Sequence, residues 1–137
     1  MTDAGAGEGG SPMKCLVVDD SATMRRIVVN SLKSIGIVET SEAANGAEAL
    51  QVCDESVGLV ITDWNMPVMG GLELVKQLRG RLQTAAIPIL MVTTRSVRDD
   101  IVQAAQAGIS SYIVKPFTPQ VLKEKIDQLL TGAAPAA

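Results

Sequence analysis

Five short apolar runs, each followed by a segment with helical spacing, constrain the fold of this 137-residue chain most strongly. The runs lie at 15–18, 37–40, 59–62, 89–93 and 112–115. Four of them are continuous or nearly so, as in parallel strands that are covered on both faces, whereas run 37–40 is more mixed and is expected nearer an edge. Strand followed by helix, repeated along the chain, predicts a doubly wound α/β fold with a five-stranded parallel sheet and five helices.

The helical segments carry apolar stripes and end signals. Ser21 is expected to cap the first helix, with Gly36 just past its end. Gly108 is expected to follow the fourth helix, and Thr118 with Pro119 to begin the fifth. The five stripes are Met24, Ile27, Val28, Leu32 and Ile35; Ala47, Leu50 and Cys53; Leu72, Val75, Leu78 and Leu82; Ile101, Ala104 and Ala105; and Leu122, Ile126, Leu129 and Leu130.

Length and composition are those of one globular domain that is large enough to enclose a core, with 47% apolar and 20% charged residues. The glycine-rich residues 1–12 and residues 132–137 are expected to be flexible tails around a folded domain at 13–131. No apolar stretch approaches the roughly 18 residues that span a bilayer, and no signal peptide pattern begins the chain. We therefore expect a cytoplasmic protein with no membrane contact. A net charge of −3 without a basic run argues against a nucleic-acid partner.

The cysteine and histidine content of the chain limits the kinds of chemistry that its side chains can perform. Cys15 lies in an apolar run and Cys53 in a helical pattern, so two buried, reduced thiols are expected rather than a disulfide, which suits the cytosol. The chain has no histidine. It therefore lacks the usual general base, the commonest metal ligand and any phosphohistidine of its own.

Polar side chains follow the ends of four predicted strands. Asp19 and Asp20 follow the first run and Asp63 ends the third. Thr93 ends the fourth run and Lys115 the fifth. Each has an ordinary structural role if taken singly, such as capping a helix or finishing a strand. Together they would meet at the carboxyl edge of one parallel sheet, where open α/β folds bind ligands.

The chemistry of this group points to phosphoryl transfer. Three carboxylates about 5 Å apart would repel by roughly 3 kcal/mol per pair at an effective dielectric near 20, so the cluster takes up protons or binds cations. Oxygen ligands alone favour a hard ion, Mg2+ above all. Lys115 adds a mobile positive charge and Thr93 a hydroxyl donor for a phosphoryl oxygen. We expect Asp63 to be the nucleophile and Asp19 and Asp20 to hold the metal, directly or through water.

These residues resemble the receiver domains of two-component response regulators. The likeness rests on Asp19-Asp20, on "TDWNMPVMGGLEL" at 62–74, on Thr93 and on "YIVKPF" at 112–117, and it covers residues 13–130. Within the family the chain is most similar to single-domain chemotaxis regulators, through "DWNMP", "AAQAG" and "VKPFT". The resemblance implies a flavodoxin-like sheet with strand order 2-1-3-4-5, which periodicity alone does not give.

The resemblance also implies a phosphoacceptor and a metal site. Asp63 would receive a phosphoryl group from a histidine on a partner kinase. Asp20, Asp63 and the main-chain carbonyl of Asn65 would bind Mg2+, with Asp19 helping directly or through water.

A switch is implied as well. Thr93 would be the switch hydroxyl, Tyr112 the aromatic whose rotamer follows it, and Lys115 the phosphate partner, with a cis peptide between Lys115 and Pro116. Tyr112 at its strand position has an alternative reading as a half-buried packing aromatic. The fourth helix, fifth strand and fifth helix would form the face that a downstream protein reads.

Two positions depart from the chemotaxis pattern beside the phosphate. Arg95 stands where an acidic residue is usual, and Thr94 replaces a smaller neighbour. Arg95 is expected to alter the lifetime of the acyl phosphate or the choice of partner. Arg95 and the glycine-rich N-terminal tail both differ from the chemotaxis regulators. They therefore weaken the inference, from the resemblance, that this chain acts on the flagellar motor.

The resulting hypothesis is a monomeric signalling protein rather than an enzyme, a response regulator with Mg2+ as cofactor. Its expected partners are a histidine kinase, a downstream target such as the flagellar motor switch, and a phosphatase. A phosphate sink or relay remains open. A phosphatase of the haloacid dehalogenase type would carry an acid where this chain has Asn65, and would need a substrate cap. A flavodoxin-like cofactor carrier is a third class, but acid after the first strand would repel flavin phosphate.

Overall fold

In the described part of the chain, one parallel sheet forms the centre of the fold. The computed structural model describes residues 13–95 and 97–131, so the expected tails at 1–12 and 132–137 lie outside the described residues. The strands are hydrogen-bonded in the order β2-β1-β3-β4-β5, which confirms the expected fold class and topology. They span β1 Lys14–Val18, β2 Glu39–Ala43, β3 Val57–Asp63, β4 Ile89–Thr93 and β5 Ser111–Val114.

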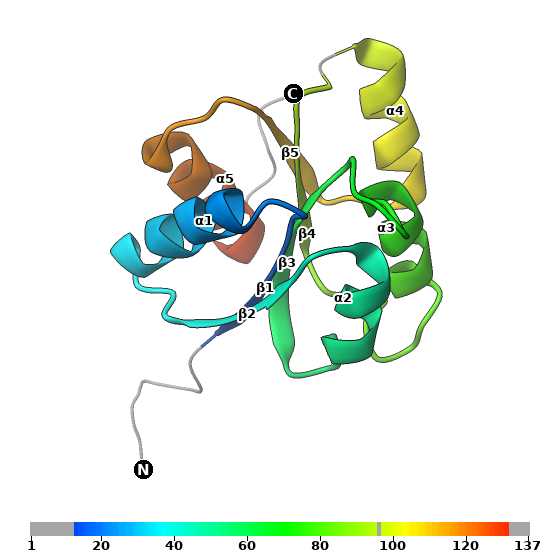
Figure 1. Ribbon diagram of the computed structural model, residues 1–137, viewed down its shortest axis with the longest axis horizontal. Helices are drawn as coiled ribbons and strands as arrows, with labels where there is room; N and C mark the ends of the chain where they lie inside the picture. The colour runs from blue at the N-terminus through cyan, green and yellow to red at the C-terminus, as the bar shows by residue number, and fades with distance from the viewer. Residues whose placement is uncertain (1–12, 96, 132–137) are drawn as a thin grey trace.

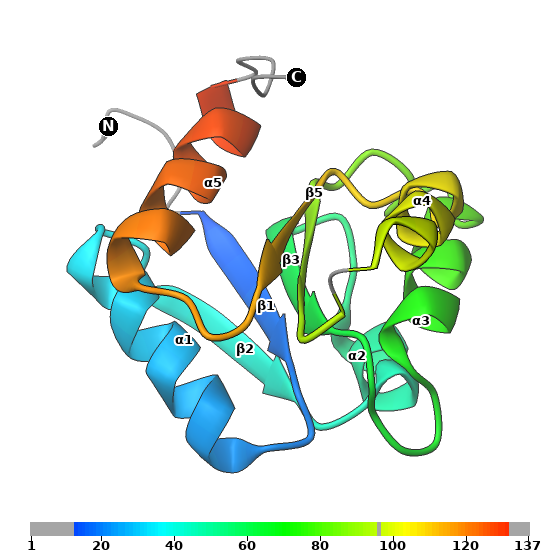
Figure 2. The same ribbon diagram turned by 90° about the horizontal axis from the view of Figure 1, so that it is seen from above.

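Within residues 13–95 and 97–131, five helices connect or follow the strands. They cover both faces of the sheet (Figures 1 and 2). They are α1 Ala22–Ser34, α2 Gly46–Val52, α3 Gly71–Arg79, α4 Arg98–Ala107 and α5 Pro119–Thr131. Helices α1 and α5 lie on one face, and α2, α3 and α4 lie on the other. Every connection between parallel neighbours is thus a crossover through a helix, as a doubly wound fold requires.

Two aliphatic cores result, one on each face of the sheet. Successive residues of a strand point to opposite faces. Leu16 and Val18 accordingly belong to the core under α2, α3 and α4, and Cys15 and Val17 to the core under α1 and α5. The central strands are buried on both sides, which explains why their sequences are continuous apolar runs. None of the described helices is both long and apolar enough to cross a membrane.

The second strand differs in position from its predicted run. Run 37–40 predicts a strand there, but β2 begins at Glu39 and continues to Ala43. Ile37 is buried in the core beneath α1 and α5, while Val38 is 64% exposed. An edge strand needs few buried side chains, so the pairing of β2 with β1 sets its register instead of its own hydrophobicity. The expected edge position of this strand is confirmed.

The residues predicted to begin or follow the helices are confirmed in these positions. The Ser21 hydroxyl accepts a hydrogen bond from the amide of Met24 (3.1 Å), and Thr118 caps α5 through the amide three residues on. Gly36 and Gly108 both have positive φ just after α1 and α4, a conformation that L-residues with a side chain disfavour.

Three residues that the apolar spacing predicts on the buried faces of helices are exposed instead. Ile27 is 47% exposed, because α1 turns Val29 rather than Ile27 toward the sheet. Leu82 is 94% exposed, because α3 ends at Arg79 and the chain leaves the helix before reaching it. Leu130 at the end of α5 is also exposed. Short helices therefore bury a narrower face than a regular apolar spacing predicts.

Both cysteines are buried and unlinked, as expected. Burial raises the pKa of the Cys15 thiol to about 12. Burial, with a smaller contribution from Asp54, also raises the pKa of Cys53. Neither thiol is activated for chemistry at neutral pH.

The junction of β3 and α3 requires a glycine. The Gly71 amide donates a hydrogen bond to the carbonyl of Trp64 (2.8 Å), which folds the start of α3 back against the end of β3. A Cβ on Gly71 would overlap the main-chain carbonyl oxygen of Asp63. Only glycine permits this approach of two backbones.

Replacing Gly71 with alanine should destabilise the protein by about 1 to 3 kcal/mol, because the overlapping atom is backbone and cannot turn aside. Gly80→Ala is the matched control, since a Cβ there would lie 3.5 Å from the Lys76 carbonyl oxygen, an ordinary contact. Its effect should stay within about 0.5 kcal/mol. Urea unfolding followed by circular dichroism measures both, and equal losses would contradict the argument.

Candidate functional site

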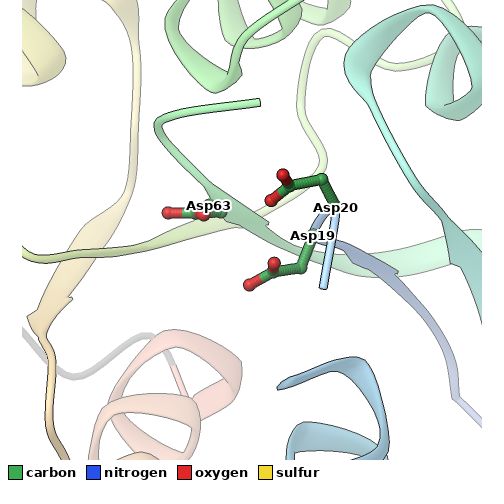
Figure 3. A group of neighbouring side chains, drawn as sticks. All are labelled: Asp19, Asp20 and Asp63. Atoms are coloured by element: carbon green, nitrogen blue, oxygen red, sulfur yellow. The ribbon is translucent and has the colours of Figure 1, made fainter. Parts of the chain in front are cut away.

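Three carboxylates meet at the carboxyl edge of the sheet (Figure 3). Asp19 and Asp20 follow β1, and Asp63 ends β3, the neighbouring strand; the register pairs Val18 with Thr62. One oxygen from each carboxylate lies within 4.8 Å of the others. The predicted cluster is therefore formed, and it arises because parallel neighbours end at the same edge.

The acidic turn after β1 is held by main-chain and side-chain hydrogen bonds. The Asp19 amide donates to the carbonyl of Ala43 on β2 (3.1 Å). The Ser21 amide donates to Asp19 Oδ1 (2.9 Å), and Arg25 donates to the Asp19 carbonyl oxygen (2.6 Å). Asp19 is buried, whereas Asp20 is exposed. One carboxylate thus belongs to the interior of the site and the other faces solvent.

Lys115 supplies the positive charge. Its Nζ lies 3.4 Å from Asp63 Oδ2 and 3.5 Å from Asp19 Oδ2. The Lys115 amide donates to the carbonyl of Thr93 (2.7 Å), and the following peptide bond, to Pro116, is cis. The ammonium group therefore reaches into the acidic cluster from β5 and bridges two of its carboxylates.

Burial raises the pKa of Asp63 above its ordinary value. The charge of Lys115 opposes this rise in pKa, the charge of Asp19 adds to it, and the hydrogen bond from the Trp64 amide to Asp63 Oδ1 (2.7 Å) also opposes it. The net direction means that the folded chain disfavours the charged carboxylate. A bound cation would remove this penalty.

The arrangement fits Mg2+. The three carboxylates each offer an oxygen within 4.8 Å of the others, and the Lys115 ammonium lies beside two of them. Hard divalent cations prefer such oxygen ligands. Asn65, whose main-chain carbonyl the family resemblance adds to the ligand set, lies two residues beyond Asp63 in the same loop, and its side chain is bonded to Arg95.

Thr93 lies at the end of β4, beside β3, which ends in Asp63. It is buried, and its hydroxyl accepts a hydrogen bond from the amide of Arg95 (2.9 Å). Thr94 is exposed and lines a surface cavity together with Lys115. Among the described residues, no acceptor takes the Thr93 hydroxyl proton.

Arg95 connects the loop that follows β3 to the start of α4. Its guanidinium lies 4.5 Å from the centre of the Trp64 ring. Its NH2 group donates to Asn65 Oδ1 (3.1 Å), and its NH1 group lies 3.4 Å from Asp100 Oδ2. The guanidinium of Arg95 is therefore in direct contact with Trp64 and Asn65, the two residues that follow Asp63.

Tyr112 lies on β5, paired with Met91 of β4. It is half-buried and packs against the core under α2, α3 and α4, with Lys125 Nζ 5.7 Å from the ring centre. The structure thus shows the packing role, and the rotamer switch remains a proposal.

Sequence reasoning missed Arg25 and its partner Glu42. The Arg25 Nε lies 2.9 Å from Glu42 Oε1 while NH1 holds the Asp19 carbonyl. The position of Arg25 in the second turn of a predicted helix was a weak signal. The pairing with Glu42 could not be read without the order of the strands.

In metal-free protein, Asp63→Asn should raise the melting temperature by about 2 to 5 °C at neutral pH. A raised folded-state pKa means that stability is lost as pH rises from the unfolded pKa of about 3.9 through the folded value. The asparagine avoids that loss, so its advantage should grow from pH 4 to neutrality. Thermal melts in EDTA measure it, with Glu55→Gln on an exposed loop as control. A lower melting temperature at every pH would contradict the prediction.

Comparison with known proteins agrees with this architecture. Residues 15–127 match the response regulator receiver domain. The chain is 52% identical over 128 residues to a chemotaxis protein CheY homolog of Campylobacter jejuni, covering 91% of this chain and 98% of that protein. It is 50% identical over 120 residues to chemotaxis protein CheY1 of Helicobacter pylori, covering 86% and 97%.

Solved structures agree with the fold as well. The chemotaxis response regulator CheY4 of Vibrio cholerae superimposes with a TM-score of 0.79 at 36% identity, covering 87% of this chain and 99% of that one. A CheY-like receiver domain protein from Methanospirillum hungatei gives 0.80 at 28% identity, covering 89% and 96%. Sequence and fold agree over nearly the whole described chain, which therefore belongs to the response regulator receiver domain family and is CheY-like within it.

Proposed function

We propose that this chain is a chemotaxis-type response regulator that accepts a phosphoryl group on Asp63 in the presence of Mg2+. The observation that carries the proposal is the meeting of Asp63 with two further carboxylates and the Lys115 ammonium at one sheet edge. The chain contains no histidine, so a phosphohistidine has to come from a partner, a histidine kinase. The names of the relatives support a role in chemotaxis.

Asp63 acts as the nucleophile in this proposal. A carboxylate oxygen forms a bond to phosphorus while the bond from phosphorus to the donor imidazole nitrogen breaks, and the imidazole leaves with its electron pair. Asp63 Oδ1 is held by the Trp64 amide, and Oδ2 faces Lys115 at 3.4 Å. Lys115 is thus close enough to follow the negative charge onto the new phosphoryl group.

The metal ligands are Asp19, Asp20, Asp63 and the main-chain carbonyl of Asn65, with Asp19 acting directly or through water. A bound Mg2+ would supply the positive charge that offsets the phosphoryl oxygens and the crowded carboxylates. The buried Asp19 and the exposed Asp20 approach from one strand, and Asp63 from its neighbour.

The switch begins at Thr93. Its hydroxyl would donate its proton to a phosphoryl oxygen, which would draw the side chain toward Asp63. Tyr112 on the adjoining strand would then turn into the vacated space. The face formed by α4, β5 and α5 would be read in two states by a downstream protein.

This activity is signalling rather than enzymatic turnover of a diffusible substrate, in a cytoplasmic monomer. The expected downstream partner is a motor-switch protein, and a phosphatase would reset the signal. A phosphate sink or relay would use the same acceptor chemistry without an output partner of its own.

Acetyl phosphate with Mg2+ should add one phosphoryl group to the intact protein, measured by mass spectrometry. Asp63→Ala should abolish the addition because it removes the nucleophile, and EDTA should suppress it in the parent chain. Asp54→Ala, which removes an exposed carboxylate far from the site, is the matched control and should label normally. Labelling that persists in Asp63→Ala, or a parent chain that never labels, would refute the proposal.

Arg95 is proposed to prolong the acyl phosphate by holding Trp64 and Asn65 beside the acceptor and limiting the entry of water. Arg95→Ala should therefore speed spontaneous hydrolysis about fivefold, the effect of losing one hydrogen bond worth about 1 kcal/mol. Release of inorganic phosphate from the labelled protein measures the rate. Arg98→Ala, an exposed arginine on α4, controls for the lost charge. An unchanged or slower rate would count against this role.

A further inference from the structure

Arg25 on α1 reaches back to the acidic turn that follows β1. Its side chain is only 18% exposed, and its two donor groups serve two different acceptors. NH1 donates to the main-chain carbonyl of Asp19 (2.6 Å), and Nε donates to Glu42 Oε1 on β2 (2.9 Å). A planar guanidinium fork is suited to such a two-point contact, because both donors are fixed in one plane.

The two peptides that flank Asp19 are each held by a hydrogen bond, one to the main chain of β2 and one from Arg25. Glu42 pairs with Val17 in the register of β1 and β2, and the next residue, Ala43, accepts the hydrogen bond from the Asp19 amide (3.1 Å). The Asp19 amide is therefore held by the main chain of β2, and its carbonyl by Arg25. The peptide that joins Asp19 to Asp20 cannot rotate without breaking one of these bonds.

This restraint matters most for Asp20. Its side chain is exposed, and among the described residues no side-chain hydrogen bond or ion pair fixes its carboxylate. Its direction is thus set by the backbone that precedes it. Like-charge repulsion from Asp19 and Asp63 would drive the acidic turn outward if that backbone were free.

We propose that Arg25, tethered by Glu42, is a positioning residue that holds Asp19 and Asp20 in the geometry that binds Mg2+. The inference rests on the metal site of the proposed function. Arg25 binds a carbonyl oxygen and Glu42, so it takes no carboxylate oxygen away from the ion. Glu42 also balances its charge, so the arginine does not repel the cation as strongly as an unpaired one would.

A purely electrostatic role and a positioning role of Arg25 predict opposite changes in Mg2+ affinity when the arginine is removed. If Arg25 acted only through its charge, its loss would bring more negative potential to the site and tighten Mg2+ binding. If it positions the turn, its loss weakens binding, in the range seen when outer partners of metal ligands are removed. The direction of the change therefore identifies the role.

The test titrates Mg2+ into the full chain and follows Trp64 fluorescence and heat by calorimetry. Arg25→Ala should weaken binding about tenfold. Arg25→Lys should recover only part of the affinity, because an ammonium lacks the fixed fork, and Glu42→Gln should weaken binding less than Arg25→Ala. Arg26→Ala, the exposed neighbour on the same helix, removes the same charge and should leave affinity unchanged or tighter.

The outcomes separate this inference from the function on which it rests. A parent chain that binds Mg2+ while Arg25→Ala binds equally or more tightly overturns the inference and leaves the proposed function intact. A parent chain that binds no Mg2+ overturns both. If Arg25→Ala fails to fold by circular dichroism, Arg25→Lys and Glu42→Gln decide, and unchanged affinity in both variants rejects the positioning role.

Discussion

Repulsion among three carboxylates at the ends of β1 and β3 is the constraint around which the site is arranged. Their oxygens lie within 4.8 Å of one another, and the Lys115 ammonium is the cation that touches two of them. This repulsion lowers the free energy of unfolding, so other interactions in the protein have to offset it. The two aliphatic cores, which bury β1, β3 and β4 on both sides, supply that stability.

The sheet explains why an acidic cluster could be predicted from the sequence. Asp19 and Asp63 are distant in the chain, yet each stands at the carboxyl end of a continuous apolar run. Parallel strands place such ends at a common edge, so the meeting of the two residues follows from the fold class. The edge strand was harder to place, because β2 is mostly polar and the apolar Ile37 belongs to the loop before it.

Contacts made by long side chains were beyond sequence reasoning. The pairing of Arg25 with Glu42 depends on β2 lying beside β1, and strand order came from the family resemblance rather than from periodicity. The stacking of Arg95 on Trp64 depends on two loops that follow adjacent strands. In each case the sequence shows the residue and its charge, but its acceptor is chosen by the three-dimensional neighbours of the chain.

The cations around the site follow a common pattern that preserves its negative charge. Arg25 donates to the main-chain carbonyl of Asp19 and to Glu42. Arg95 donates to the side-chain amide oxygen of Asn65 and pairs with Asp100. Among the cationic side chains of the described residues, only Lys115 contacts the clustered carboxylates, at 3.4 and 3.5 Å, which is longer than the roughly 2.8 Å of a tight charged hydrogen bond. The arginines thus fix the backbone and loops of the site, which under the proposed function would leave its carboxylates to bind the metal ion and its ammonium to move toward the phosphoryl group.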